Sequence, residues 1–252
     1  MRSMIRKLVP FPIRSAIAWR RASTANRNGS LWCPVCEHSV AQFLPHGNPP
    51  KADILCPICR SKACHRLAWA WFRQNSNMFR SGGAFVHIAP EVQLGKYLSR
   101  RCRKAKMKYL HGDITDSQHP LDIMNLRLSS NSVDVLFACH VLNMVSDDVV
   151  ALKEIYRVVK PGGVAILPVP IHSDVSQTIE AAADSPQTDR QTLFNDSLMF
   201  RKYAGDDYLQ RLTSIGFQPA IFRPTDVVEQ NHSNWSLCNE WVQTAMKSEI
   251  DS

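Results

Sequence analysis

The segment GAFVHIAPEVQL, residues 83–94, decides the fold of this chain. Its apolar residues at positions 85, 86 and 88 predict a buried strand. In nucleotide-binding sheets such a strand runs into a glycine-rich turn that opens a helix. Here the turn is Ala89-Pro90-Glu91, without glycine, and a helix is expected over residues 92–104. The segment therefore predicts a strand–turn–helix unit, and it raises the question of whether a turn without glycine can still bind a ligand.

From about residue 66 onward the chain alternates strand and helix patterns. Further strands are predicted at residues 108–110, 133–138, 164–169 and 217–222. Apolar residues at helical spacing predict helices over 147–159 and 207–215. The first of these helices is expected to end at Lys160-Pro161-Gly162-Gly163, a basic last turn followed by residues that stop helices. Strands that alternate with helices of this length indicate an α/β fold with a mostly parallel sheet, covered on both faces.

Four of the eight cysteines form two C-x-x-C pairs, with 19 residues between the pairs: Cys33, Cys36, Cys56 and Cys59. This spacing is typical of a zinc site. Each short turn aims two sulfurs at one ion, and two turns complete a tetrahedron with Zn–S bonds of about 2.3 Å. We therefore expect a zinc-ribbon-like module, with iron as the alternative metal. A thioredoxin-type redox role is not favoured, because no βαβ pattern surrounds either pair.

Two further potential ligands, Cys64 and His65, follow the second pair. A site with four cysteine ligands has no open position, so its zinc is expected to be structural and to stabilise a segment too small to fold alone. Cys64 is therefore expected to pack in the interior and not to bind metal.

The net charge of +8 is placed unevenly along the chain. Residues 1–30 carry seven basic side chains and no acidic one, which leaves the rest of the chain close to neutral. The basic isoelectric point is therefore weak support for a nucleic-acid partner. Three interpretations of this basic arm stay open: a mobile tail, an organellar transit peptide, and a segment that lies on anionic lipid at a membrane surface.

Some classes of protein are disfavoured by the sequence. No apolar run approaches the roughly 20 residues that a transmembrane helix needs, and the N-terminus lacks the apolar core of a secretory signal. Eight cysteines without such a signal indicate a reducing compartment, so we expect the cytoplasm. We divide the chain into a basic arm (1–30), a four-cysteine zinc-binding module (31–65) and an α/β domain (66–252).

Three stretches of the chain together resemble a class I S-adenosylmethionine-dependent methyltransferase: FVHIAPE (85–91), CHVLNMVSDDVVALKEIYRVVKPGGVAILPVP (139–170) and RKYAGDDYLQRLTSIGF (201–217). More narrowly, the chain resembles a bacterial group in which a two-knuckle segment precedes this domain and the first motif is A-P-E. The resemblance covers roughly residues 31–245. It implies a Rossmann-like, seven-stranded sheet and S-adenosylmethionine as cofactor. A family-wide A-P-E turn would mean that the loss of glycine is not decay.

The resemblance places the first cofactor contacts in the A-P-E motif, at His87, Ala89 and Glu91. Ala89 is the smallest residue after glycine, so the backbone can still approach a ligand closely. Glu91 is expected to hold the ammonium group of the cofactor. Because S-adenosylmethionine has no pyrophosphate, its site does not need the nest of N–H groups that a glycine-rich turn supplies.

Further contacts are carried over from the resemblance by position. Asp113 matches the acid expected on the ribose hydroxyls, with a turn role as the alternative. Asp122 and Ile123 match the pair that meets the adenine amino group and packs on the ring, with a surface loop as the alternative. Cys139 and His140 end the fourth strand, where the site of an open parallel sheet belongs. A structural role for His140 is the alternative.

The chain departs from the family pattern in two places. Relatives often have H-V-L-E-H after the fourth strand, whereas this chain has Asn143 and Met144 in place of the acid and the second histidine. Relatives tend to have D-H-V-R-x-Y later, and the matching stretch DSLMFRKY keeps Arg201 and Tyr203 but lacks the histidine. If those polar groups act on substrate, the specificity or activity of this chain differs. No catalytic base can be named.

The expected function is methyl transfer to a small-molecule or glycan-like acceptor. One alternative is an RNA methyltransferase, for which RRCRKAKMK (100–108) supplies six cations. No aromatic residues interleave with these cations, so a solvated helix end is the preferred interpretation. The other alternative is a non-catalytic binding protein that keeps the fold.

Overall fold

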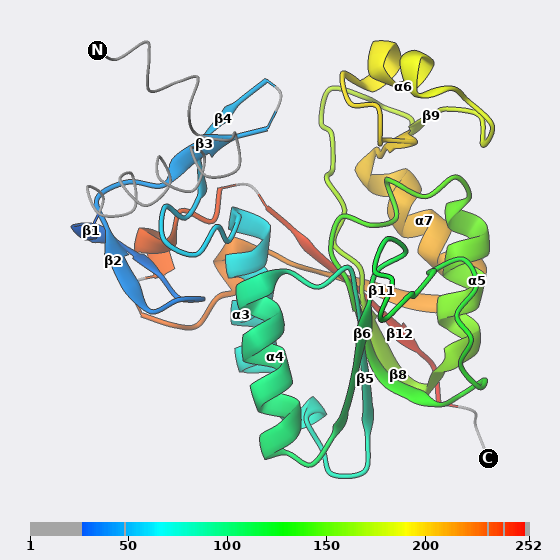
Figure 1. Ribbon diagram of the computed structural model, residues 1–252, viewed down its shortest axis with the longest axis horizontal. Coiled ribbons are helices and arrows are strands. Elements are labelled where there is room, and N and C mark those ends of the chain that lie inside the picture. The colour runs from blue at the N-terminus through cyan, green and yellow to red at the C-terminus, as the bar shows by residue number, and fades with distance from the viewer. Residues whose placement is uncertain (1–26, 48, 231, 239, 250–252) are drawn as a thin grey trace.

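The computed structural model describes residues 27–47, 49–230, 232–238 and 240–249 (Figure 1). The expectations for residues 1–26, including contact of the basic arm with lipid, lie outside the described residues. The last residues assigned to that arm form part of strand β1 (Arg27–Cys33), which pairs antiparallel with β2 (His38–Val40).

A six-stranded sheet forms the centre of the molecule, in the order β11-β12-β8-β7-β5-β6. Its strands are β5 (Ala84–Ile88), β6 (Lys108–Gly112), β7 (Val133–Ala138), β8 (Val159–Ile166), β11 (Phe217–Phe222) and β12 (Val242–Lys247). Strands β6, β5, β7 and β8 are parallel, whereas β12 is antiparallel to both β8 and β11. The expected α/β class with a mostly parallel, Rossmann-like sheet is confirmed.

The sheet has six strands among the described residues, and not the seven expected. After β6 the chain makes a single bridge, between Asp113 and Pro120, in place of an edge strand. The carboxylates of Asp113 and Asp116 turn this segment, because they accept backbone hydrogen bonds from Thr115 (2.7 Å) and Gln118 (2.8 Å).

Helices cover both faces of the sheet (Figure 1). Helices α3 (Ala63–Gln74) and α4 (Val92–Lys104) lie on one face, and α5 (Asp148–Val158) and α7 (Gly205–Ile215) lie on the other. Helix α6 (Gln187–Phe194) stands away from the sheet, beyond α7 (Figure 1). Phe85 and Phe137 pack with α3 and α4, while their strand neighbours Val86 and Leu136 pack with α5 and α7. The shorter elements are η1 (Ser76–Met78), β9 (Ile179–Glu180), β10 (Arg201–Lys202), η2 (Pro224–Asp226) and η3 (His232–Trp235).

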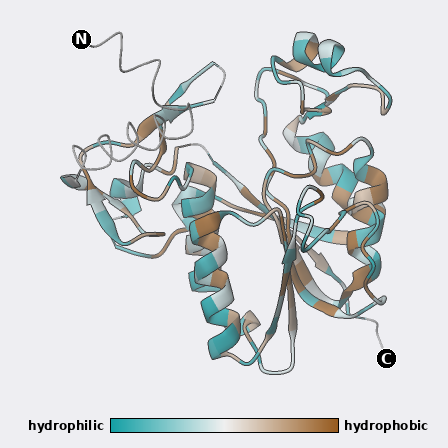
Figure 2. Cartoon of the chain, in the orientation of Figure 1, coloured by the Kyte–Doolittle hydropathy of each residue, from teal (hydrophilic) through white to brown (hydrophobic). Residues whose placement is uncertain are grey.

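Figure 2 shows hydrophilic residues along much of α4, whose last turn carries Arg101, Arg103 and Lys104. These cations stand at the carboxyl end of the helix, where the helix dipole favours positive charge. Within the part of the chain that the structure describes, no helix has both the length and the apolar character needed to cross a membrane.

Helix α3 was not predicted from the sequence. Ten of its twelve residues are buried, from Ala63 to Phe72, so it lacks the polar face that marks an amphipathic helix. The buried polar residues His65 and Arg66 also interrupt its apolar pattern. The helix crosses the boundary expected at residue 65 and so connects the cysteine-bearing segment to the sheet.

The stretch Lys160-Pro161-Gly162-Gly163 lies inside β8 and does not separate a helix from a strand. Helix α5 ends at Val158, β8 begins at the next residue, and the register of β8 against β7 shifts here. Gly162 has a φ of +71°, a conformation that suits glycine. The stretch therefore forms a bulge in the sheet, and the expected strand 164–169 is corrected to Val159–Ile166.

The four-cysteine module consists of two small hairpins, β1–β2 and β3–β4, where β3 is Leu44–His46 and β4 is Lys51–Leu55. Arg66 of α3 joins these hairpins to the rest of the molecule. Its side chain is 0% exposed and lies over the ring of Phe43, 3.9 Å from the centroid. Its guanidinium group donates hydrogen bonds to five backbone carbonyls, those of Asp53, Ile54, Ser61, Trp235 and Ser236.

Asp134 of β7 links three parts of the sheet and is 5% exposed. Its carboxylate accepts hydrogen bonds from Arg80 (2.7 Å), Lys160 (2.7 Å) and the backbone N–H of Ala84 (2.8 Å). Burial opposes ionisation of this group, but the hydrogen bonds from Lys160, Ala84 and Arg80 lower the pKa of Asp134 below its ordinary value of 3.8.

Replacing Asp134 with Asn is expected to lower the free energy of unfolding at pH 7 by about 1–3 kcal/mol, because charge-assisted hydrogen bonds are lost. A depressed pKa stabilises the fold above pH 3.8 and ceases to do so as the pH falls through the folded-state pKa. The difference between the two proteins should therefore shrink below about pH 4 in denaturant titrations. The exposed Asp184→Asn variant serves as a control and should match the wild type. A difference that stays constant with pH would show that the charge of Asp134 is not the cause.

Candidate functional site

The four cysteines of the two knuckles converge on one point. Their sulfur atoms all lie within 4.8 Å of one another, with 3.7 Å between Cys33 and Cys59 and 3.9 Å between Cys36 and Cys56. A tetrahedral zinc ion with Zn–S bonds of about 2.3 Å requires sulfurs roughly 3.8 Å apart. The backbone N–H of Ile58 also points at the sulfur of Cys56, at 3.4 Å. The donor set fits a closed four-thiolate metal site.

The A-P-E turn follows β5 at the carboxyl edge of the sheet. Ala89 has a φ of +48°, in the left-handed region that glycine usually occupies. Its N–H donates to the carbonyl of Gly112 at the end of β6 (2.8 Å). Glu91 then stands as the N-cap residue of α4, and its carbonyl accepts the first helical hydrogen bond from Gly95 (2.7 Å). The chain therefore makes a glycine-like turn with alanine, at a cost of about 1–2 kcal/mol.

Glu91 is held by two histidines from different parts of the chain. The Nε2 of His87 donates to one carboxylate oxygen (3.2 Å) and the Nε2 of His65 lies 3.4 Å from the other. The Nδ1 of His87 accepts a hydrogen bond from the hydroxyl of Tyr109 (2.8 Å), and the Nδ1 of His65 accepts one from the backbone N–H of Lys62 (3.2 Å). Because each Nδ1 accepts, the proton of each ring lies on Nε2. A network therefore runs from β6 through the A-P-E turn to the start of α3.

The charge of Glu91 follows from this network. Burial would raise the pKa of Glu91, but the hydrogen bond from His87 and the electrostatic attraction of the nearby His65 ring lower it below the ordinary value of 4.5. Glu91 is therefore an ionised carboxylate at neutral pH. The expected role of Glu91 toward an ammonium group stays a prediction, while its role in tying His65 to His87 is visible in the geometry.

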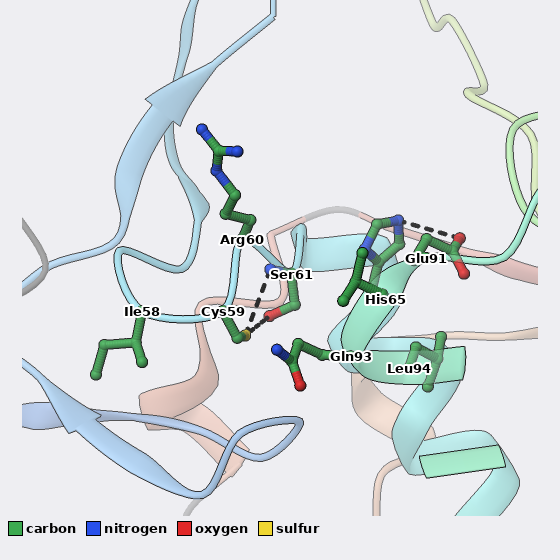
Figure 3. A pocket seen from close by; sticks show the side chains of 9 residues that line it. Ile58, Cys59, Arg60, Ser61, His65, Glu91, Gln93 and Leu94 are labelled. Atoms are coloured by element: carbon green, nitrogen blue, oxygen red, sulfur yellow. Dashed lines mark hydrogen bonds and ion pairs between the residues drawn. The ribbon is translucent and has the colours of Figure 1, made fainter. Parts of the chain in front are cut away.

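A cavity of about 230 Å³ opens between the second knuckle and the amino end of α4 (Figure 3). His65 and Glu91 face one another at its wall. The lining is shared by the cysteine module, α3 and α4: Ile58, Cys59, Arg60, Ser61, His65, Glu91, Val92, Gln93 and Leu94. A ligand in this cavity would contact both the module and the A-P-E turn.

Two acids expected at the cofactor shape their own loops. Asp113 accepts hydrogen bonds from the backbone N–H (2.7 Å) and hydroxyl (2.6 Å) of Thr115. Asp122 accepts a hydrogen bond from the backbone N–H of Met124 (2.8 Å), and Ile123 is buried in the core. These contacts fit the alternatives given for the two acids, a turn role for Asp113 and a loop role for Asp122. In both cases one carboxylate oxygen, Oδ1, makes these contacts, so their cofactor roles stay predictions.

Cys139 and His140 follow β7 at the same edge of the sheet as the A-P-E turn. His140 has a φ of +55°, and its N–H donates to the carbonyl of Pro168 (2.8 Å). A left-handed non-glycine residue that the surrounding structure holds in place is a feature of functional sites. The sulfur of Cys139 lies 4.0 Å from that of Cys64. The structure thus brings Cys64 and His65 of α3 to the expected site, which sequence spacing alone did not indicate.

Arg201 and Tyr203 hold the loop after β7 and are buried. Arg201 donates to the carbonyl of Ser146 (2.7 Å), and the hydroxyl of Tyr203 donates to Asp148 (2.6 Å). These contacts give both retained residues a structural role in the loop. Asn143, which stands where relatives often have an acid, is buried in this loop, and its Oδ1 has no hydrogen-bond partner among the described residues.

Residues 75–167 match the family described as a methyltransferase domain. This range contains the A-P-E turn and every residue expected at the cofactor, and it excludes the four-cysteine module. No curated protein matches the chain.

Solved structures resemble the chain at low sequence identity. The 1,6-didemethyltoxoflavin-N1-methyltransferase of Burkholderia thailandensis, with bound 1,6-didemethyltoxoflavin and S-adenosylhomocysteine, is 12% identical with a TM-score of 0.50, and the match covers 73% of this chain and 78% of that one. The phosphoethanolamine N-methyltransferase 2 of Haemonchus contortus, in complex with S-adenosyl-L-methionine, is 12% identical with a TM-score of 0.45. That match covers 71% of this chain and 53% of the other, so this chain spans about half its length. The α/β part of the chain has the fold of class I S-adenosylmethionine-dependent methyltransferases.

We expect the four-cysteine cluster to hold one zinc ion. Replacing Cys56 with Ser should remove one metal equivalent and expose residues 31–65 to amide hydrogen exchange, because a structural zinc site supplies about 10 kcal/mol of folding free energy in small modules. The exposed Cys238→Ser variant should keep the metal. Unchanged metal content in the Cys56 variant, measured by mass spectrometry of the native protein, would refute this assignment.

Proposed function

We propose that this protein transfers a methyl group from S-adenosylmethionine to a small-molecule or glycan-like acceptor. The observation that carries the proposal is the turn at Ala89, which makes a glycine-like conformation at the carboxyl edge of the mostly parallel sheet. The family match over residues 75–167 supports the same activity. The Burkholderia enzyme, which holds S-adenosylhomocysteine, shares this fold.

The residues at this edge suit the parts of the cofactor. The ionised carboxylate of Glu91 faces a cavity and would attract the ammonium group. Asp113 would accept hydrogen bonds from the ribose hydroxyls. Asp122 would accept a hydrogen bond from the adenine amino group, and Ile123 would pack on the adenine ring. The cofactor supplies a methyl group on a sulfonium, and such a transfer can proceed largely by alignment of donor and acceptor. The chain therefore needs to orient the reactants more than to supply a strong base.

A small acceptor is favoured by the nearly neutral body of the chain. The cations of α4 do not favour RNA, because they stand at a helix end where the dipole stabilises them. An RNA methyltransferase would show RNA retention that falls steeply with salt. We place the protein in the cytoplasm, with contact between the basic arm and anionic lipid as a further prediction.

Calorimetry with S-adenosylmethionine and S-adenosylhomocysteine tests the proposal directly. The Asp113→Ala variant should bind the cofactor about 1.5–3 kcal/mol more weakly, the scale for a lost charge-assisted hydrogen bond. Asp116→Ala is the matched control, because Asp116 caps a turn in the same loop and is not expected at the cofactor. Absence of binding by the wild type at millimolar cofactor would favour the non-catalytic alternative.

The turn itself is tested at Ala89. A β-branched side chain fits poorly at positive φ and would fill the space that a ligand must approach, so Ala89→Val should abolish cofactor binding. Ala89→Gly should bind as the wild type does and gain up to about 1 kcal/mol in unfolding free energy, because relief of the left-handed strain slightly exceeds the entropy cost of glycine. Equal binding by the Val variant would contradict this account.

A further inference from the structure

A second cluster of metal-binding side chains lies at the junction of α3 and β7, apart from the four-cysteine site. Cys64, Cys139 and His140 each offer one ligand atom, and these atoms all lie within 4.8 Å of one another. Cys64 comes from the first turn of α3, whereas Cys139 and His140 follow β7. Residues separated by more than 70 positions in the sequence therefore converge on one point.

The sulfur spacing of this cluster matches that of a metal site. The sulfurs of Cys64 and Cys139 are 4.0 Å apart, close to the 3.7 Å and 3.9 Å pairs of the four-cysteine site. Two thiolates that bind one tetrahedral ion stand roughly 3.8 Å apart. A disulfide needs a bond of about 2.05 Å, so these thiols would have to approach by nearly 2 Å to form one.

Burial separates the two kinds of ligand in the cluster. Cys64 is 1% exposed and Cys139 is 8% exposed, while His140 is half-buried. The left-handed backbone at His140 places a histidine where β7 ends, beside the buried thiols. Two buried sulfurs with a more accessible imidazole make an asymmetric, three-ligand set. Such sets are used in open metal sites, where the fourth position takes water or substrate.

A neighbouring triad points to the side on which the fourth position would open. His65, Glu91 and Cys139 also have ligand atoms within 4.8 Å of one another, and His65 and Glu91 line the cavity beside the A-P-E turn. His65 is already bound to Glu91, and Glu91 is also bound to His87. We therefore assign the ligand role to Cys64, Cys139 and His140, and we place His65 and Glu91 between that site and the cavity.

We propose that Cys64, Cys139 and His140 bind a second divalent transition-metal ion of the zinc class, with one coordination position open. Two thiolates and one imidazole are soft and borderline donors that select such ions over magnesium or calcium. An ion there would join α3 to β7 and would lower the pKa of a water, alcohol or thiol bound to it. The proposal concerns metal binding alone and does not depend on the cofactor.

Metal stoichiometry of the full-length protein tests the proposal. Protein purified under reducing conditions, supplied with excess Zn²⁺ and dialysed, should hold two equivalents. Cys64→Ser and Cys139→Ser should each hold one. Cys102→Ser is the matched control, because Cys102 is also buried and free but belongs to neither cluster, and it should hold two. One equivalent in the wild type, or two in the Cys139 variant, would overturn the proposal.

A second measurement guards against loss of folding in the core variants. His140→Gln changes the half-buried ligand, so it should keep the fold, as judged by its thermal unfolding, and lose at least tenfold in affinity for the second Co²⁺ ion. Substitution with Co²⁺ separates the two sites by their thiolate-to-cobalt absorption, which should fall by about a third when two of the six thiolates no longer bind metal. Undiminished second-site affinity in His140→Gln, or a Cys64–Cys139 disulfide that persists under reductant, would refute the assignment.

Discussion

The buried guanidinium of Arg66 is the interaction on which the arrangement of this molecule depends. Among the described residues it has no carboxylate partner, and its donors are bound by five backbone carbonyls from the cysteine module and the C-terminal segment. Burial lowers the pKa of Arg66, yet a guanidinium group stays protonated at any physiological pH. The planar guanidinium group has five N–H donors in fixed directions, so it can bind all of these carbonyls, whereas the ammonium group of lysine has only three donors. The contact fixes the rotation of α3, and the two preceding residues, Cys64 and His65, are thereby aimed at the edge of the sheet.

The A-P-E turn shows how a strained backbone is kept in a glycine-free loop. Ala89 takes a left-handed conformation, which contacts on both sides of it hold in place. On one side, its N–H donates to the carbonyl of Gly112. On the other side, two histidines bind the carboxylate of Glu91. One of those histidines lies on β5 and the other on α3. This turn, made without glycine, is therefore held by contacts with the neighbouring strand and with α3.

Local signals allowed much of the fold to be predicted. The strand at 133–138 and the helix at 92–104 were located to the residue, because apolar periodicity and end signals agree there. Helix α3 was missed because buried polar residues break its pattern, and their partners, such as Trp235, are 169 positions away. The glycine stretch before residue 164 was misassigned because a sheet bulge and a helix stop use the same residues. The A-P-E turn was located from the sequence, but the link from Glu91 to His65 was not, since it arises from tertiary packing.

The cavity beside Glu91 has two walls of different origin. One wall, from Ile58 to Ser61, is the loop around the second knuckle, and the other is the first turn of α4, with His65 of α3 between them. The first wall includes Cys59, whose sulfur belongs to the four-cysteine cluster, whereas the second is anchored to the sheet. If the four-cysteine cluster holds the expected zinc ion, the wall from Ile58 to Ser61 takes its shape from that ion, so loss of the metal would alter this side of the cavity.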